Sequence, residues 1–367
     1  MPPLSLLIKP ASGLCNMRCR YCFYADVSKH RTEASFGIMT PDTLETLVRK
    51  ALGYAEGTCI FGFQGGEPTL AGLDFFKHLI SLQRKYNSNR LKILNNIQTN
   101  GLRLKPSWAE FFALNNFLVG LSLDGSKPIH DMFRKDSNGG GTYDEVQKTA
   151  ALFSRSKIEY NILCVVNNAI ASAPREVYST LRKHKFLQFI PCLDGFSSSA
   201  REPYSLSTEN YANFMKVTFD KYYKDFTNGE YVSIRNFDNY VNIIKGRRPE
   251  QCGMNGKCSV YFLIEADGSV YPCDFYVFDE WSLGNVNNMS FPKMAKSATA
   301  QEFVDISKPI HPKCAVCKWF GLCHGGCRRY REPLIDNKPS LNILCEANKA
   351  FFEYAYDRMC KMAAKVN

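Results

Sequence analysis

The chain has 367 residues, of which 45% are hydrophobic and 22% charged, the composition of an ordinary folded globular protein. This composition excludes a disordered, collagen-like or coiled-coil chain, and no apolar run approaches the roughly 20 residues of a membrane-spanning helix. The net charge of +11 fits an acidic partner, a nucleic acid or a solvated surface. We favour the solvated surface because the basic runs 245–248 and 328–329 form no continuous stripe.

The N-terminal segment and the cysteine count predict a cytoplasmic protein. The apolar stretch at 4–8 is too short for a signal peptide, no basic residue precedes it, and Leu14 does not suit a cleavage site before Cys15. The chain has 15 cysteines. Because disulfides are rare in the reducing cytoplasm, clustered cysteines indicate metal binding or catalysis.

Short stretches rich in apolar, β-branched and aromatic residues predict strands, and longer stretches between them predict helices. The strands are expected at 4–8, 59–63, 91–97, 117–123, 160–166 and 186–190, and the helices at 41–55, 70–86, 143–155 and 175–183. Thr40 before Pro41 is a helix-start signal. Strands that alternate with helices indicate an α/β fold of parallel units, whose ligand sites lie at the carboxyl ends of the strands.

The character of the sequence changes near residue 200. Residues 194–207 are rich in Gly, Ser and Pro and predict a loop, and a helix is expected at 208–223. Further on, eight cysteines fall within 94 residues that show little periodicity, which indicates a small domain held together by metal. A last helix is expected at 346–365. We therefore expect one domain over 1–230 and a second over 231–367.

The first cysteine cluster follows the first predicted strand directly. Cys15, Cys19 and Cys22 have the spacing C-x3-C-x2-C, which lets three thiolates close around one metal centre. A structural zinc site would need a fourth ligand, and none stands nearby in the sequence. A [4Fe–4S] cluster with three protein thiolates would leave one iron open, which is the mark of a catalytic centre. A zinc knuckle with a distant fourth ligand is the alternative.

The run CNMRCRYCFY at 15–24 resembles the signature of radical S-adenosylmethionine (SAM) enzymes. The resemblance implies a partial (β/α)6 barrel, in agreement with the predicted strands, and a [4Fe–4S] cluster on the three cysteines whose open iron binds SAM. It also implies that the SAM site includes Tyr21 and Tyr24 from this run, the segment Gln64, Gly65, Gly66 and Glu67, and then Ser122, Arg134 and Leu193. Arg134 suits the SAM carboxylate because a guanidinium binds a carboxylate through two hydrogen bonds.

The second cysteine cluster resembles the SPASM extension of radical SAM enzymes. The spacing C-x9-G-x4-C begins at Cys258, and C-x2-C-x5-C-x3-C begins at Cys314. The resemblance implies two fully ligated auxiliary [4Fe–4S] clusters, the first on Cys252, Cys258, Cys273 and Cys327 and the second on Cys314, Cys317, Cys323 and Cys345. Two structural zinc sites are the alternative. Of the remaining cysteines, we expect Cys59 and Cys164 to be buried as small hydrophobic residues, Cys192 to lie near the SAM site and Cys360 to be structural.

Across almost the whole chain the sequence resembles the anaerobic sulfatase-maturating enzymes, which oxidise a Cys or Ser of a sulfatase polypeptide to Cα-formylglycine. The family's catalytic aspartate corresponds to Asp274, which directly follows Cys273. The resemblance implies that a 5′-deoxyadenosyl radical takes a β-hydrogen, that Asp274 takes the thiol or hydroxyl proton, and that an auxiliary cluster takes the second electron. A thiol of pKa about 8.5 and an Asp of about 3.9 make an early transfer uphill by roughly 6 kcal/mol. Burial would have to raise the pKa of Asp274, or the proton would leave after hydrogen abstraction.

Three alternatives remain at this stage. A maturase of a ribosomally made peptide shares the same chemistry, and the 14 residues before Cys15 count against it because many such enzymes carry an N-terminal leader-binding domain there. A zinc-dependent binding protein would be colourless, and a nucleic-acid-modifying enzyme would bind with a steep salt dependence. Our prediction includes an unfolded or nascent sulfatase segment as substrate, an electron donor such as flavodoxin or ferredoxin, and neither nucleic acid nor membrane as partner.

Overall fold

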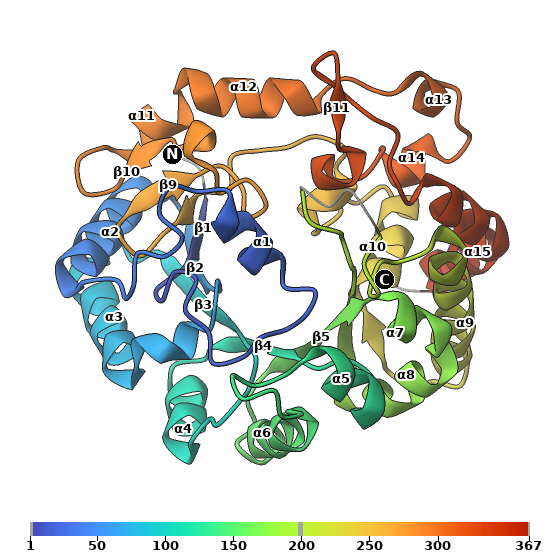
Figure 1. Cartoon of the computed structure of the whole chain (residues 1–367), viewed down its shortest axis with the longest axis horizontal. Helices are drawn as coiled ribbons and strands as arrows, with labels where there is room; N and C mark the ends of the chain where they lie inside the picture. The colour runs from blue at the N-terminus through green and yellow to red at the C-terminus, as the bar shows by residue number, and fades with distance from the viewer. Residues whose placement is uncertain (1–2, 197–200, 366–367) are drawn as a thin grey trace. The chain divides into compact units, whose positions relative to one another are not determined.

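The computed structural model describes residues 3–196 and 201–365, and the chain forms two compact units (Figure 1). The first unit consists of Met1–Leu123, Asp131–Tyr160 and Val260–Glu302. The second consists of Asp124–His130, Asn161–Ser259 and Phe303–Asn367. Among the described residues, no helix is long and apolar enough to cross a membrane.

The first unit is built on a mainly parallel sheet. Its central strands run parallel in the order β1 (Leu4–Ile8), β2 (Thr58–Phe63), β3 (Lys92–Thr99) and β4 (Leu118–Ser122). On the other side of β1 follow β8 (Leu263–Ile264), which is parallel to it, and then the antiparallel strands β9 (Ser269–Tyr271) and β10 (Gly284–Asn285). The pairing of β1 with β8 brings a segment from residues 260–302 to the end of the N-terminal strand.

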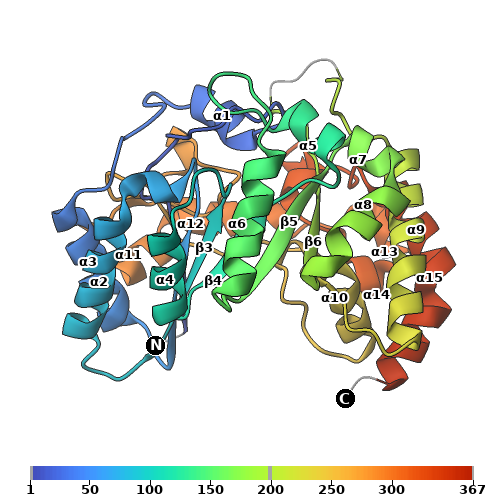
Figure 2. The same cartoon turned by 90° about the horizontal axis from the view of Figure 1, so that it is seen from below.

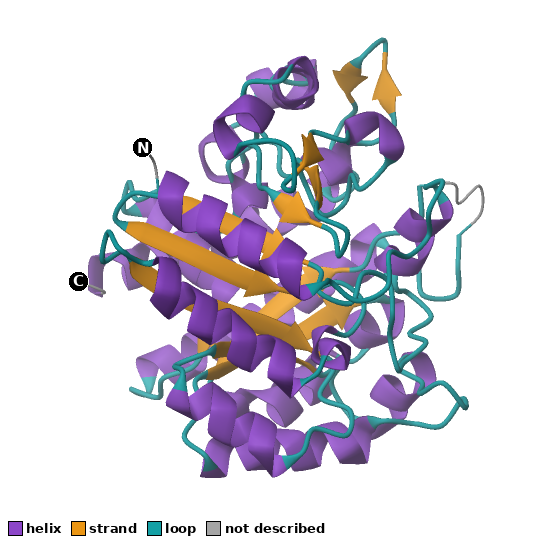
Figure 3. Cartoon of the chain, turned by 90° about the vertical axis from the view of Figure 1, so that its left-hand side faces the viewer, coloured by secondary structure: helices purple, strands orange, loops and turns teal. Residues whose placement is uncertain are grey.

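Helices cover the outer face of these strands (Figures 2 and 3). Their apolar faces bury residues such as Leu47 and Phe76, and the ring of Phe76 lies 5.1 Å from that of Phe63 in β2. The helical elements of the first unit are α1 (Phe23–Lys29), α2 (Pro41–Tyr54), η1 (Pro68–Ala71), α3 (Leu73–Tyr86), α4 (Pro106–Leu114), α6 (Tyr143–Arg155), η4 (Asp279–Trp281) and α11 (Phe291–Ala295). As predicted, the Thr40 side chain caps α2 by accepting a hydrogen bond from Thr43 N.

The second unit contains three parallel strands and a helical layer. The strands are β5 (Tyr160–Val166), β6 (Phe186–Pro191) and β7 (Ser233–Ile234), and a small hairpin is formed by β11 (Leu334–Ile335) and β12 (Lys338–Pro339). The helical elements are α7 (Asn168–Ser172), α8 (Pro174–Leu181), η2 (Arg182–His184), α9 (Thr208–Thr227), α10 (Arg235–Ile244), η3 (Cys252–Met254), α13 (Pro312–Ala315), α14 (Phe320–Cys323), η5 (Arg328–Arg331) and α15 (Cys345–Lys365). Helices α5 (Lys127–Phe133) and α12 (Ala298–Ser307) each have residues in both units.

Aromatic side chains hold the long helices of the second unit together. The ring of Phe351 in α15 lies 5.6 Å from Phe219 in α9 and 5.4 Å from Phe237 in α10, and all three side chains are fully buried. Edge-to-face and offset ring pairs at such distances add to the stability that burial provides. The core of this unit therefore lies between α9, α10 and α15, beside the segment that carries most of the later cysteines.

The structure confirms the predicted α/β alternation. All six predicted strands are present, as β1 to β6, and the last helix spans Cys345–Lys365. The helix expected at 70–86 is instead divided, because Gly72 adopts φ +88° and ends η1 before α3 begins at Leu73. Residues 197–200 of the expected loop 194–207 lie outside the described residues, and its other residues form no helix or strand. The predicted domain boundary between 230 and 231 stays a prediction.

Candidate active site

The first cysteine cluster lies in the loop between β1 and α1. Cys22 is the residue before α1, and its backbone N–H donates to the carbonyl of Cys19. The sulfur of Cys15 accepts from Met17 N at 3.4 Å and from Asn100 Nδ2 at 3.7 Å. N–H donors directed at a cysteine sulfur stabilise a thiolate, which is the form that ligates iron. The donor set of this loop therefore fits the expected iron–sulfur cluster.

The GGEP segment packs directly against this loop. Gly66 N donates to Ser12 O at 2.9 Å, and Glu67 N donates to Leu14 O at 2.7 Å. A Cβ atom on Gly66 would lie 2.0 Å from the carbonyl oxygen of Leu14, so only glycine allows this approach. Gly65 and Gly66 thus position the loop that carries the three cysteines. This structural role is additional to the SAM binding predicted for both glycines.

Glu67 is almost fully buried and holds the ends of two strands together. Its Oε1 accepts from Thr69 N and Oγ1 and from Thr99 Oγ1, and its Oε2 accepts from Asn100 N at 2.8 Å. Burial raises the pKa of this carboxyl, and these donors oppose that increase. Glu67 therefore has a direct structural role beside its predicted role in the SAM site.

The other residues predicted to bind SAM occupy both units. In the first unit, Arg134 Nη1 donates to Tyr21 Oη at 3.2 Å, and both side chains are buried. Ser122 is buried at the carboxyl end of β4 in the same unit. Leu193 belongs to the second unit, where it is half-buried just beyond β6. The structure thus joins Tyr21 to Arg134, and the contacts of these residues with SAM stay predictions.

Asp274 lies in the first unit at the centre of a polar cluster. Its Oδ2 accepts hydrogen bonds from Tyr24 Oη at 2.7 Å and from Gln64 Nε2 at 2.5 Å. Its Oδ1 is buried without a hydrogen-bond partner among the described residues, and Lys9 Nζ is 3.6 Å away. The sequence predicted Tyr24 and Gln64 only as cofactor-binding residues, whereas the structure also places them on the predicted base.

Three charged residues of this cluster were not predicted from the sequence. Lys9 Nζ lies 3.4 Å from Glu265 Oε1, and Arg31 Nη1 lies 2.6 Å from the same oxygen. All three side chains are at most 3% exposed. Lys9 and Glu265 directly follow the buried strands β1 and β8. A charged residue at the carboxyl end of a parallel strand is a sequence feature that could have identified both as candidate site residues.

Burial and charge act in opposite directions on the two carboxyl groups. Burial raises the pKa of Asp274, and the neighbouring Lys9 cation only partly offsets this increase. Burial also works to raise the pKa of Glu265, but Lys9 and Arg31 together pull that pKa below its usual value. Glu265 therefore holds its negative charge more firmly than an exposed glutamate, whereas Asp274 accepts a proton more readily than an exposed aspartate.

In the second unit, the structure gathers the four cysteines predicted to hold the second auxiliary cluster. One small pocket is lined by Cys314, Cys317, Cys323 and Cys345 together with apolar neighbours. Burial, together with the charge of the three other thiols, raises the pKa of Cys323 to about 11. Four thiols that share one pocket are the donor set that a fully ligated [4Fe–4S] cluster needs, so these residues fit the expected group.

Three of the four cysteines predicted for the first auxiliary cluster are also neighbours within the second unit. Burial raises the pKa of Cys327 to about 12, and Cys252 and Cys258 add to this increase through charge repulsion. The fourth, Cys273, belongs to the first unit. Among the described residues, no three Cys, His, Asp or Glu side chains are arranged around a single-ion site. The cluster ligands accordingly stay predictions.

The four remaining cysteines lie in the core or on a helix. Cys59 and Cys164 are fully buried in β2 and β5, as expected for small hydrophobic residues. Cys192 is 7% exposed beyond β6, and burial raises its pKa, so its thiol is protonated. Cys360 is half-buried in α15.

Comparison with known proteins gives a consistent result over the whole chain. The radical SAM superfamily matches residues 10–171, and the iron-sulfur cluster-binding domain SPASM matches residues 252–318. The chain is 48% identical to a cysteine-type anaerobic sulfatase-maturating enzyme of Clostridium perfringens, with 100% of each chain covered. It is 45% identical to a cysteine-type enzyme of Clostridium novyi (99% of this chain and 98% of the relative) and 30% identical to a serine-type enzyme of Bacteroides thetaiotaomicron (96% and 89%).

Solved structures support the same assignment. The chain matches native anSMEcpe with bound AdoMet at a TM-score of 0.96 and 48% identity, and 100% of each chain is covered. The complex of native anSMEcpe with AdoMet and Cp18Cys peptide matches equally well over the same extent. These matches confirm the predicted fold class, a radical SAM α/β part followed by a cysteine-rich SPASM part. Streptococcus suis SuiB bound to S-adenosylmethionine, at 17% identity and a TM-score of 0.64, shares the fold over 93% of this chain and 77% of its own.

Proposed function

Because the chain belongs to the anaerobic sulfatase-maturating enzymes, which are radical SAM enzymes that modify proteins after translation, we propose that it oxidises a cysteine of a sulfatase polypeptide to Cα-formylglycine. The relatives at 45% and 48% identity are cysteine-type enzymes, whereas the serine-type relatives are 29–30% identical. This difference supports a cysteine in the client segment.

The proposed cofactors are SAM and three [4Fe–4S] clusters. The SAM-binding cluster is assigned to Cys15, Cys19 and Cys22, the first auxiliary cluster to Cys252, Cys258, Cys273 and Cys327, and the second to Cys314, Cys317, Cys323 and Cys345. When bound, these groups supply the adenosyl radical that removes a β-hydrogen and accept the second electron that the substrate loses. A flavodoxin or ferredoxin is the proposed electron donor, and the reducing cytoplasm the proposed compartment.

The contribution of the protein is to take the proton of the substrate thiol. Removal of this proton, the β-hydrogen and the second electron leaves a thioaldehyde, which water then hydrolyses to the aldehyde with release of hydrogen sulfide. Tyr24 and Gln64 fix Asp274 Oδ2 through two hydrogen bonds, so the carboxylate cannot rotate freely. Oδ1 is buried, accepts no hydrogen bond from the described residues and lies 3.6 Å from Lys9 Nζ. A general base must be held in place, and the two hydrogen bonds to Oδ2 do this while Oδ1 keeps its hydrogen-bonding capacity.

The raised pKa of Asp274 makes this role energetically reasonable. Transfer from a thiol of pKa about 8.5 to an ordinary Asp of about 3.9 is uphill by roughly 6 kcal/mol. Burial raises the pKa of Asp274 and so reduces this difference. Lys9 keeps the group from being protonated too early, because a nearby cation favours the charged form. The arrangement of Asp274 between Tyr24, Gln64 and Lys9 is the observation on which the proposed function depends.

The substitution Asp274→Asn tests this role. We expect the variant to release 5′-deoxyadenosine from SAM while it forms less than about 1% of the wild-type formylglycine, since loss of a general base typically costs a factor of 10² to 10⁴. Asp279→Asn is the matched control, because Asp279 lies on the same segment but accepts its hydrogen bonds from the exposed Thr32, outside the cluster around Asp274. A normal formylglycine yield in Asp274→Asn would remove this residue from the mechanism.

A further inference from the structure

A basic cavity of about 600 Å³ lies within the second unit, beside two cysteines predicted to hold a cluster. Arg247, Arg248 and Lys257 supply its positive charge, and Cys252 and Cys258 form part of its wall. No Asp or Glu is among the described residues that line it. The cavity therefore combines three cations with the side chains that would hold a redox group.

These cations face solvent and are not neutralised. Arg247, Arg248 and Lys257 are all exposed. Arg247 Nη1 has a neutral partner, Asn242 Oδ1, at 3.4 Å. In the part of the chain that the structure describes, none of the three cations forms an ion pair. Unpaired charges of one sign around a concave surface produce a field that attracts an oppositely charged partner.

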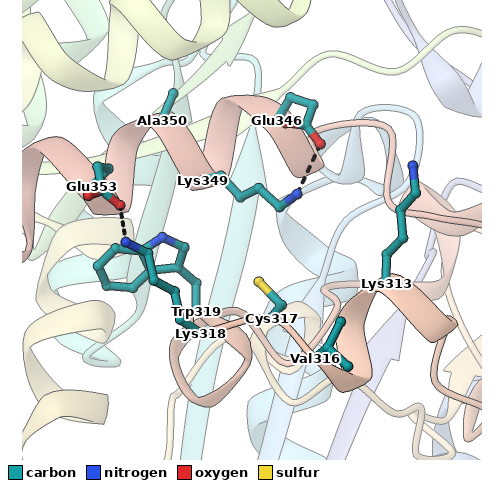
Figure 4. A pocket seen from close by; sticks show the side chains of 9 residues that line it. All are labelled: Lys313, Val316, Cys317, Lys318, Trp319, Glu346, Lys349, Ala350 and Glu353. Atoms are coloured by element: carbon teal, nitrogen blue, oxygen red, sulfur yellow. Dashed lines mark hydrogen bonds and ion pairs between the residues drawn. The ribbon is translucent and has the colours of Figure 1, made fainter.

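A second cysteine-lined cavity in the same unit offers a contrast (Figure 4). It also has three lysines, Lys313, Lys318 and Lys349, and the wall includes Cys317. There, however, Lys318 forms an ion pair with Glu353 at 2.5 Å, and Lys349 forms one with Glu346 at 3.1 Å. Two of its three cations are thus neutralised, so its field is much weaker.

We propose that the basic cavity of Arg247, Arg248 and Lys257 is the docking site of a small acidic electron-carrier protein with a flavin or iron–sulfur group. The proposal rests on the proposed function, in which one electron leaves the substrate after hydrogen abstraction and its proton goes to Asp274. Cys252 and Cys258 would hold the group that relays this electron, and the docked oxidised carrier would take it up and so be reduced by one electron. Electrostatic complementarity of this kind mainly accelerates association.

The lining of the cavity argues for a protein partner over a nucleic acid. Proteins that bind single strands combine positive charge with aromatic rings on which bases stack. Among the described residues that line the cavity there is no Phe, Tyr or Trp. His324 supplies a single imidazole ring to this lining, and three cations with so little stacking surface suit the carboxylate-rich face of a carrier protein.

The test is a binding measurement between the cluster-loaded enzyme and an oxidised acidic flavodoxin, by calorimetry at two salt concentrations. The variant Arg247→Gln/Arg248→Gln/Lys257→Gln should bind the flavodoxin at least about tenfold more weakly at low salt and show a flatter salt dependence. The control Lys313→Gln/Lys318→Gln/Lys349→Gln loses the same formal charge and should stay within about twofold of wild type. Iron content and circular dichroism establish that both variants fold, and Arg248→Gln alone serves if the triple variant does not.

Three results would overturn the proposal. The first is equal affinity for flavodoxin in the wild type and in the variant that lacks the cations at 247, 248 and 257. The second is an equal loss of affinity in that variant and in the lysine control variant. The third is displacement of flavodoxin by single-stranded RNA at physiological salt. The proposed function is tested separately with dithionite as the reductant. If dithionite supports no formylglycine formation in wild type while flavodoxin binding depends on the three cations, the proposed function fails and the docking site stands.

Discussion

Replacing Lys9 by methionine should disable the base while leaving SAM cleavage in place. The side chain is 3% exposed, and its ammonium lies 3.6 Å from Asp274 Oδ1 and 3.4 Å from Glu265 Oε1. At an effective dielectric constant of about 20, the attraction to Asp274 is worth about 4 to 5 kcal/mol. Its loss therefore raises the pKa of Asp274, and the attraction of about 4 to 5 kcal/mol is the upper limit of that effect, at about 1.36 kcal/mol for each pH unit.

The assay is the pH profile of formylglycine formation, with 5′-deoxyadenosine measured in the same samples. In Lys9→Met a smaller fraction of Asp274 is ionised near neutral pH, so the ascending limb of the profile should move to higher pH by one to three units. Deoxyadenosine formation should change by less than about threefold. Lys9→Arg, which keeps the cation, should retain the wild-type profile. An unshifted profile in Lys9→Met would refute the assigned role of this charge.

The variant Lys77→Met is a matched control that isolates the effect of burial on the contribution of an ion pair to stability. Lys77 forms an ion pair with Asp74 at 3.1 Å, but the two side chains are 60% and 96% exposed. Lys77→Met should therefore cost less than about 1 kcal/mol of unfolding free energy. Lys9→Met breaks a buried pair and should cost about 3 to 5 kcal/mol. Urea unfolding of both variants measures this difference, and equal midpoints would contradict it.

Three further predictions follow from individual contacts. Gly66→Ala should abolish cluster incorporation, measured as iron content, because its Cβ would lie 2.0 Å from a backbone carbonyl oxygen. Gly53→Ala is the control: its Cβ would have open space, so the iron content should not change. Tyr24→Phe removes one donor from Asp274 and should lower formylglycine formation about 10-fold or more per 5′-deoxyadenosine released, a ratio that corrects for the predicted contact of Tyr24 with SAM. Burial lowers the pKa of His184 to about 4, so the folded state binds fewer protons than the unfolded state as pH falls from about 6.5 to 4. Stability should decline over that range, and His184→Gln should remove this part of the decline in urea titrations.

Local patterns in the sequence were sufficient to predict the strands and the cysteine clusters. The spacing of Cys15, Cys19 and Cys22 is a local feature, and the alternation of apolar runs with helical stretches marks each strand separately. The resemblance to the SPASM extension pointed to four later cysteines that line one pocket of the structure, and their role as cluster ligands stays a prediction. Such features are recognisable because each depends on residues close together along the chain.

The charged cluster around the base depends on contacts that the sequence does not encode locally. Arg31 and Glu265 are 234 positions apart, and Gln64 and Asp274 are 210 apart. These pairs form because β8 is placed beside β1, a pairing of two very short segments with no periodic signal. The same holds for Gly66, whose need for glycine comes from a carbonyl in another loop.

The most direct test of the proposed function is mass spectrometry of two sulfatase-motif peptides, one with Cys and one with Ser at the target position. Each is incubated without oxygen with cluster-loaded enzyme, SAM and dithionite, and 5′-deoxyadenosine is quantified alongside. We expect an aldehyde on the Cys peptide, formed faster than on the Ser peptide and in step with deoxyadenosine. Deoxyadenosine formation with both peptides unchanged would contradict sulfatase maturation by this chain.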